Sequence, residues 1–340
     1  MNPRLSILAV ILNCISYSVI LYIRCFNLYI SIESGVKMIE NILYKIEELK
    51  KEKNAIILAH YYERPEIQDV ADYVGDSYYL SKIARDCKEN VIVFCGVKFM
   101  AESAKILSPQ KTVLLPNIDA GCPMAEMADA ATLAKVKEDH PNAAVVCYIN
   151  STAEVKALCD VSVTSSSAVK IIENIDKDEI IFLPDKNLGG YISEKFPNKK
   201  FILWNGFCIT HKKVKVENIH SIKVLRPEAK VLVHPECEGE VRAVADFIGS
   251  TGEIIDYATK SSSNEFVIVT EEGVLHELKK RNPNKSFYVP GTTMTCVNMK
   301  KTILEDVYES LLYNQHEIIL DEEIRLKALA SLENMHKLGG

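Results

Sequence analysis

Three cysteines occupy matching places in the chain, each at the end of a strand-like run. Cys122 follows TVLLPNIDAG, Cys208 follows KFILWNGF and Cys296 follows SFYVPGTTMT, so the three residues are 86 and 88 positions apart. None of them belongs to a Cys-x-x-Cys pair, which makes a zinc ribbon a poor match. Brought to a common centre, three thiolates would bind a [4Fe–4S] cluster and leave one iron open to water or substrate. An open iron polarises a hydroxyl or carbonyl oxygen, which suits dehydration or elimination.

The other cysteines fit other roles. Packing as small apolar residues is the interpretation for Cys87, Cys95, Cys147 and Cys159, which lie inside helix-like or strand-like runs. Cys237, in the segment HPEC, competes as a ligand because it lies beside the candidate site. Ten cysteines in 340 residues are too sparse for a disulfide scaffold. A reducing compartment, the cytoplasm, is therefore expected.

The segments that precede these cysteines repeat with the same period. Residues 70–77 are VADYVGDS, residues 158–165 are LCDVSVTS and residues 244–251 are VADFIGST. The repeat aligns Asp72 with Asp160 and Asp246. A period this long exceeds that of a solenoid repeat and indicates a domain that occurs three times.

Three further apolar runs, AIILAHYY, VVCYIN and VLVHPE, align at the same offsets and end in polar residues. The polar pairs at their ends are His60 with Tyr62, Tyr148 with Asn150, and His234 with Glu236. A spacing of two places both side chains of a pair on one face of a strand. Histidine binds anions or moves protons near neutral pH, and Tyr and Glu serve as general acids or bases.

Three hydroxyl residues, Ser77, Ser165 and Thr251, also align, near expected helix starts or turns. Helix N-termini bind carboxylate and phosphate groups, although ordinary helix capping explains any one of these residues equally well. Together they predict a small substrate with several anionic groups. The chain has no glycine-rich dinucleotide fingerprint and no P-loop.

Alternating strand-like and helix-like runs predict the elements that position these residues. AIILAH (55–60), VIVFCG and TVLLP are expected strands of the first repeat, and PEIQDVADYV, YYLSKIARDC and AESAKIL are expected helices. Nearly continuous apolar strands indicate parallel sheets covered on both faces, so the fold class is α/β with three pseudo-symmetric αβα domains. The expected domains are residues 38–125, 126–211 and 212–299, followed by helices in residues 300–340 that pack on the first repeat. Ligands of such sheets bind beyond the carboxyl ends of the strands.

The amino-terminal segment, residues 1–37, differs from the rest. Leu5 to Ile23 is an uncharged and mostly apolar stretch, long enough to span a bilayer. It is either a membrane anchor or the product of an over-long assignment of the start site, because Met38 opens an amphipathic helix pattern. A net charge of −6 gives no support for nucleic-acid binding.

The chain resembles the quinolinate synthases, iron–sulfur enzymes of de novo NAD biosynthesis. The motifs that carry the resemblance are AHYY (59–62), GDS (75–77), VKFMAESAKIL (97–107), AGCPMA (120–125), CYIN (147–150), VTSSSAVK (163–170), WNGFC (204–208), HPEC (234–237), STG (250–252) and MTCVNMKK (294–301). They extend in the family order from Met38 almost to the end of the chain. The last motif departs from the Cys-Pro loop of many members, which bears on the shape of the loop more than on its ligand.

The resemblance implies one [4Fe–4S] cluster per chain, held by Cys122, Cys208 and Cys296. It implies a transferase-type synthase that condenses iminoaspartate with dihydroxyacetone phosphate to quinolinate, with release of phosphate and water. Family substrate contacts match His60, Ser77, Tyr148, Asn150, Ser165, His234, Glu236 and Thr251. The catalytic candidates are Tyr62, His234 and Glu236, the first and last of them for proton transfer.

Two alternatives stay open at this stage. One is another enzyme with three cysteines on a [4Fe–4S] cluster, of the diphthamide type or a reductive dehydroxylase. The other is a non-enzymatic iron–sulfur sensor or electron carrier, which would need a fourth protein ligand such as Cys237. An aspartate oxidase or aspartate dehydrogenase that hands over iminoaspartate in a transient contact is the protein partner compatible with the synthase assignment.

Overall fold

The computed structural model describes residues 39–291 and 294–339. The chain divides into two compact units, residues 1–48 and residues 49–340. Residues 39–53 form a single helix, as the pattern after Met38 predicts, and Ile46 on its apolar face is buried. The apolar segment 5–23, expected to be an anchor or a start-site artefact, lies outside the described residues. No helix among the described residues is both long enough and apolar enough to cross a membrane.

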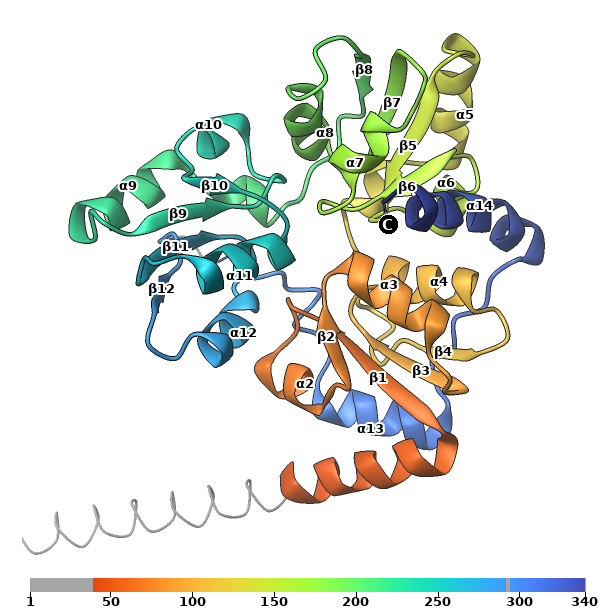
Figure 1. Ribbon diagram of the computed structural model, residues 1–340. Coiled ribbons are helices and arrows are strands. Elements are labelled where there is room, and N and C mark those ends of the chain that lie inside the picture. The colour runs from red at the N-terminus through yellow and green to blue at the C-terminus, as the bar shows by residue number, and fades with distance from the viewer. Residues whose placement is uncertain (1–38, 292–293, 340) are drawn as a thin grey trace, which may run out of the picture. The chain divides into compact units, whose positions relative to one another are not determined.

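Three four-stranded parallel sheets form the second unit (Figure 1). The first has the order β2 (Tyr73–Gly75), β1 (Ala55–His60), β3 (Val91–Cys95) and β4 (Thr112–Leu114). The second has the order β6 (Val161–Val163), β5 (Ala144–Tyr148), β7 (Glu179–Leu183) and β8 (Lys200–Leu203). The third has the order β10 (Phe247–Ile248), β9 (Lys230–Val233), β11 (Glu265–Val269) and β12 (Ser286–Tyr288). This common order confirms the predicted α/β class with three similar αβα domains, and each sheet falls within one predicted repeat.

Helices connect the strands and cover the sheets. The first sheet is accompanied by α2 (Pro65–Val70), α3 (Ser77–Asp86) and α4 (Lys98–Leu107). The second is accompanied by α5 (Ala130–Asp139), α6 (Ala153–Lys156), α7 (Ala168–Glu173) and α8 (Lys186–Ser193). The third is accompanied by α9 (Val216–Leu225), α10 (Gly239–Arg242), α11 (Thr251–Lys260) and α12 (Val274–Arg281). Short 3-10 helices follow two of the site cysteines, η1 (Ala125–Met127) and η2 (His211–Lys213).

The repeated aspartate performs the same task in each domain. The carboxylates of Asp72, Asp160 and Asp246 accept the backbone N–H of Ile57, Val145 and Val231 at 2.8, 2.7 and 2.8 Å. The backbone N–H of each aspartate donates in turn to the carbonyl of the same partner at 2.9 Å. These bonds hold the segment that contains each aspartate beside the central strand of its sheet. The prediction of one helix over residues 65–74 was therefore wrong in its second half. Helix α2 ends at Val70, and residues Tyr73–Gly75 form the edge strand β2.

A second repeated residue, a lysine, closes the end of a helix in each domain. Each ammonium group donates to backbone carbonyls at the helix end that precedes a strand: Lys111 to Cys87 and Glu89, Lys199 to Ile175 and Lys177, and Lys285 to Ala258, Thr259 and Ser261. Each lysine stands two residues after a proline in the sequence. This short pattern extends the threefold repeat to the loops.

The expected packing of residues 300–340 on the first repeat needs a correction. Helix α13 (Leu304–Tyr313) contacts β3 of the first sheet. Helix α14 (Glu322–Gly339) contacts α4 of the first domain, but also β6, α6 and α7 of the second. Its buried residues Ala328, Leu332 and Met335 join the core that contains Val161 and Val163. An apolar helix face in a sequence predicts burial, but it does not identify the sheet that receives it.

Candidate active site

The carboxyl-terminal ends of the three sheets line one pocket of about 900 Å³, its open mouth included. Strand β1 ends at His60, β5 ends at Tyr148, and β9 ends one residue before His234. Every residue predicted for the site lines this pocket: His60, Tyr62, Ser77, Cys122, Tyr148, Asn150, Ser165, Cys208, His234, Glu236, Thr251 and Cys296.

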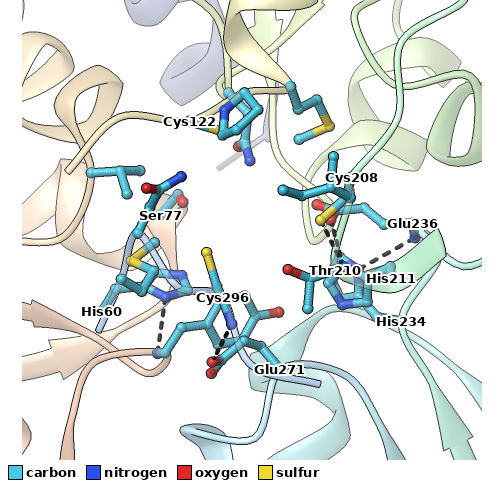
Figure 2. A pocket seen from close by; sticks show the side chains of 18 of the residues that line it. His60, Ser77, Cys122, Cys208, Thr210, His211, His234, Glu236, Glu271 and Cys296 are labelled. Carbon is cyan, nitrogen blue, oxygen red and sulfur yellow. Dashed lines mark hydrogen bonds and ion pairs between the residues drawn. The ribbon is translucent and has the colours of Figure 1, made fainter. Parts of the chain in front are cut away.

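The three cysteines approach the pocket from three sides (Figure 2). They lie in the equivalent loops that follow β4, β8 and β12. Burial raises the pKa of the Cys122 thiol to about 12, and burial also raises the pKa of Cys208 and Cys296. Such thiols stay protonated unless a metal ion displaces the proton. The donor set therefore fits a metal centre that is ligated by three thiolates.

Cys237, the competing ligand, lies away from the pocket. It is fully buried in the core of the third domain, and it is not among the residues that line the pocket. Its thiol donates to the carbonyl of Val269 at 3.7 Å. Its surroundings match the packing role of a small apolar residue.

A buried ion pair supports the loop of Cys296. Glu271 accepts the backbone N–H of Cys296 at 2.9 Å with one carboxylate oxygen and that of Gly273 at 2.7 Å with the other. The ammonium group of Lys300 lies 3.2 Å from this carboxylate and also donates to the backbone carbonyl groups of Tyr62 and Glu63. The pair thus joins a loop of the third domain to the strand end of the first.

His60 and His234 have the same environment in two domains. The Nδ1 atom of His60 accepts the backbone N–H of Tyr62 at 3.1 Å, and the Nδ1 atom of His234 accepts that of Glu236 at 3.3 Å. These bonds assign the proton of each neutral ring to Nε2. Burial lowers the pKa of each histidine to about 3. Both rings are therefore neutral near pH 7 and have an Nε2–H group to donate.

Hydrogen bonds between domains connect the other strand-end residues. The hydroxyl group of Tyr148 donates to Glu236 Oε1 at 2.6 Å. The hydroxyl oxygen of Tyr62 lies 2.7 Å from Thr251 Oγ1 and 2.8 Å from Thr270 Oγ1. Burial raises the pKa of both tyrosines well above its usual value. Both phenols are therefore protonated at neutral pH.

The carboxyl group of Glu236 is ionised, unlike the neutral histidine and tyrosine side chains around it. Burial alone would raise the pKa of its carboxyl group, but His211 beside it and the hydrogen bonds from His211 and Tyr148 lower that pKa below its usual range. The group is therefore a charged carboxylate among the neutral donors of the strand ends, in a pocket that Asp76, Lys213 and Glu271 also line. Such a carboxylate can accept a proton.

The hydroxyl residues stand at helix starts, as expected. Ser77 is the first residue of α3 and Thr251 is the first residue of α11. Ser165 precedes α7, and its Oγ lies 3.3 Å from His234 Nε2. Asn150 Oδ1 is buried and has no hydrogen-bond partner within residues 39–291 and 294–339. The hydroxyl groups of Ser77, Ser165 and Thr251 can donate to an anionic ligand near the N-terminal ends of two helices.

His211 is a site residue that the sequence analysis missed. Its Nδ1 lies 3.2 Å from Cys208 Sγ and 2.8 Å from Glu236 Oε2, and its ring stacks on His234 with centroids 4.9 Å apart. The available signal was the spacing Cys208-x-x-His211, which forms a turn that leads into η2 and is closed by the bond from the backbone N–H of Lys212 to the carbonyl of Cys208 at 3.0 Å. Glu271 was also missed, because a carboxylate that follows a buried strand gives no sign of the distant loop that it binds.

Comparisons with known proteins agree with one another. Residues 44–337 match the family described as quinolinate synthetase A protein. The quinolinate synthase of Clostridioides difficile is 63% identical over 301 residues, which cover 88% of this chain and 99% of that protein. The quinolinate synthase of Clostridium perfringens (strain SM101) is 64% identical over 296 residues, or 87% of this chain and 98% of that protein. The quinolinate synthase of Clostridium acetobutylicum is 59% identical over 303 residues, or 89% of this chain and 100% of that protein.

Proposed function

The chain belongs to the quinolinate synthase family, and on this premise we propose how its pocket makes quinolinate. The substrates are iminoaspartate and dihydroxyacetone phosphate, which condense with loss of phosphate and water. The observation that carries the proposal is that three thiols and the polar ends of three sheets meet in one pocket. An enzyme that closes a ring between two small anionic molecules needs such a mixture of metal ligands, anion donors and proton carriers.

We assign one [4Fe–4S] cluster per chain to Cys122, Cys208 and Cys296. Their equivalent loops and their common pocket support this assignment, and the position of Cys237 in the core argues against a fourth thiolate. A cluster with three protein ligands supplies a Lewis acid at its remaining iron. The electron-carrier alternative loses support, because it needs a fourth ligand and has no use for the polar strand ends.

The neutral donors bind the anionic groups of the substrates. His60 and His234 present Nε2–H groups, and Ser77 and Thr251 present hydroxyl groups at the starts of α3 and α11. The N-terminal ends of these helices add the partial positive charge of unpaired N–H groups. Carboxylate and phosphate groups are therefore held mainly by neutral donors, although Lys213 also lines the pocket. Tyr148, Asn150 and Ser165 complete the ring of donors from the second domain.

Glu236 and Tyr62 move protons. Glu236 is charged near neutral pH and takes a proton from the substrate, while the hydroxyl group of Tyr148 holds its Oε1 in place. Tyr62 is protonated, and it gives a proton to a leaving oxygen through its contacts with Thr251 and Thr270. His234 fixes Glu236 by accepting its backbone N–H. Loss of water requires both proton transfers. One proton leaves a carbon or nitrogen atom of the substrate, and another is added to the departing oxygen.

A supplier of iminoaspartate and a reducing compartment complete the proposal. An imine of this kind must come from an enzyme that oxidises aspartate, an oxidase or a dehydrogenase. The described cysteines are all free thiols, which supports a location in the cytoplasm.

Anaerobic reconstitution tests the proposal. We expect iron and sulfide to load the full chain with broad visible absorption, and the loaded chain to make quinolinate from iminoaspartate and dihydroxyacetone phosphate. Glu236→Gln should lower turnover by about 10²–10⁴-fold at equal iron content, because the proton acceptor is lost. Glu240→Gln, a change at an exposed position of α10, is the matched control. A fully loaded chain that makes no quinolinate would contradict the proposal.

A further inference from the structure

A second metal-binding arrangement exists inside the pocket. Cys208, His211 and Glu236 each offer one ligand atom, and these atoms all lie within 4.8 Å of one another. His211 Nδ1 is 3.2 Å from Cys208 Sγ and 2.8 Å from Glu236 Oε2. Figure 2 shows the three side chains grouped on one side of the pocket, apart from Cys122 and Cys296. Two of the three ligand residues, His211 and Glu236, do not belong to the proposed cluster.

Outer contacts fix the orientation of these ligands. His211 Nδ1 donates to Glu236 Oε2 in the metal-free site, and His211 Nε2 lies 3.0 Å from Thr270 Oγ1; when a metal ion replaces the Nδ1 proton, this hydroxyl group can accept the proton at Nε2. The ring of His234 stacks against the ring of His211 at an angle of 26° between the planes. Glu236 Oε1 accepts the hydroxyl proton of Tyr148, which turns Oε2 toward His211. Partners of this kind orient metal ligands in proteins.

We propose that the cluster-free chain binds one divalent transition-metal ion, Fe²⁺ or Zn²⁺, through Cys208, His211 and Glu236, with its fourth position open to the pocket. One sulfur, one imidazole nitrogen and one carboxylate oxygen are donors that both ions accept. Tetrahedral ligands at normal bond lengths are about 3.3–3.6 Å apart, so the two contacts of His211 need to open by about half an ångström or less. Binding releases the thiol proton of Cys208 to solvent.

The inference has a consequence for loading with iron. Because Cys208 belongs to both sites, an ion at the second site excludes the cluster, and this point rests on the proposed function. Zn²⁺ binds nitrogen and sulfur donors more tightly than Fe²⁺ does, so it should occupy the site and block loading.

Titration of the cluster-free full chain with Co²⁺ under anaerobic conditions tests the site. Co²⁺ reports thiolate ligation by a charge-transfer band, and we expect one equivalent to bind with this band. Cys208→Ser should abolish the band, and His211→Ala should weaken binding by about tenfold or more. Cys122→Ser and Cys296→Ser are the matched controls, because each removes a proposed cluster ligand and should leave the band unchanged. Circular dichroism checks that each variant is folded, and His211→Asn replaces His211→Ala if the latter is not.

The outcomes separate this inference from the proposed function. Absence of Co²⁺ binding in a chain that still forms a cluster and makes quinolinate overturns the second site alone. Loss of the band in Cys122→Ser or Cys296→Ser also overturns it, because the ion would then lie among the three cysteines. Binding of Co²⁺ by a chain that makes no quinolinate supports the site and contradicts the proposed function. In the wild-type chain, one equivalent of Zn²⁺ added first should lower the yield of the cluster, and His211→Ala should reduce that effect.

Discussion

At the residue scale, most of the polar strand-end groups that line the pocket are neutral hydrogen-bond donors and not charged side chains. His60 and His234 are buried and uncharged, and each is fixed by a backbone N–H from two residues further along the chain. A lysine in the same place would carry a charge that the buried surroundings penalise. Neutral N–H and O–H groups avoid that penalty and still donate to a carboxylate or a phosphate. Among the strand-end residues Glu236 is charged, and it is the one that we assign to proton transfer.

Acid should destabilise the protein through these two histidines. In the unfolded chain each binds a proton as the pH falls below 6.5, whereas in the folded chain each stays neutral down to a pKa of about 3. The stability that they contribute is therefore complete above pH 6.5 and is lost as the pH falls toward 3. At pH 5 the loss is about 2 kcal/mol for each histidine.

Unfolding of the cluster-free chain in urea at pH 7 and pH 5 measures this loss. We expect His234→Gln to lose about 2 kcal/mol less than the wild type between the two values. His220→Gln, a change at an exposed position of α9, should behave as the wild type. The same response to pH in His234→Gln and the wild type would show that His234 is not a neutral buried group.

At the scale of elements, the loop of Cys296 depends on a contact with the first domain. Glu271 follows β11 and accepts the backbone N–H of Cys296, while Lys300 ties Glu271 to the backbone carbonyl of Tyr62. The same position in the second domain is Asp185, which caps α8 and lies in an isolated bridge with Gly206 near Cys208. A carboxylate that follows the third strand thus supports two of the three cysteine loops.

Removal of the Lys300 ammonium group should loosen this loop. Lys300→Met leaves Glu271 buried without its cation, and we expect a cost of about 3 kcal/mol in the free energy of unfolding. The loaded protein should also lose iron faster to a chelator, because Cys296 is then less firmly placed. Lys279→Met, a change at an exposed position of α12, is the matched control. Equal rates of iron loss in the two variants would contradict a role for Lys300 in holding the loop.

At the scale of the whole molecule, periodicity in the sequence predicts the three similar sheets and the repeat-aligned residues of the pocket, but not His211 or Glu271. A repeat aligns equivalent residues, and parallel sheets bring their strand ends to one edge. The contacts between domains could not be predicted in this way. Tyr148 with Glu236 and Tyr62 with Thr251 join residues from different repeats, and no pattern within one repeat reports its neighbour. The short edge strands were missed for a related reason, since two or three residues do not establish a period.

The threefold repeat allows the same substitution to be made at three equivalent positions of the chain. Replacing Asp72, Asp160 or Asp246 by Ala removes the same bond to a central strand, so we expect each change to cost about 1–2 kcal/mol. Asp72 and Asp246 also pair with Lys50 and Lys230, but these pairs are partly exposed and add little. The changes lie in separate domains and should add. Urea unfolding of the single and triple variants measures this, and a triple variant much less stable than the sum would contradict independence.

The distribution of the three cysteine loops over three domains has a consequence during synthesis on the ribosome. Two intervals of 86 and 88 residues separate Cys122 from Cys296. At about 5–20 residues per second, the first thiol waits roughly 10–35 s for the last. During that interval the nascent chain has a first domain that can fold and no complete metal centre. Iron and sulfide must therefore be delivered after the third domain has been synthesised. Slower translation lengthens the time during which the Cys122 thiol is open to oxidation without its two partners.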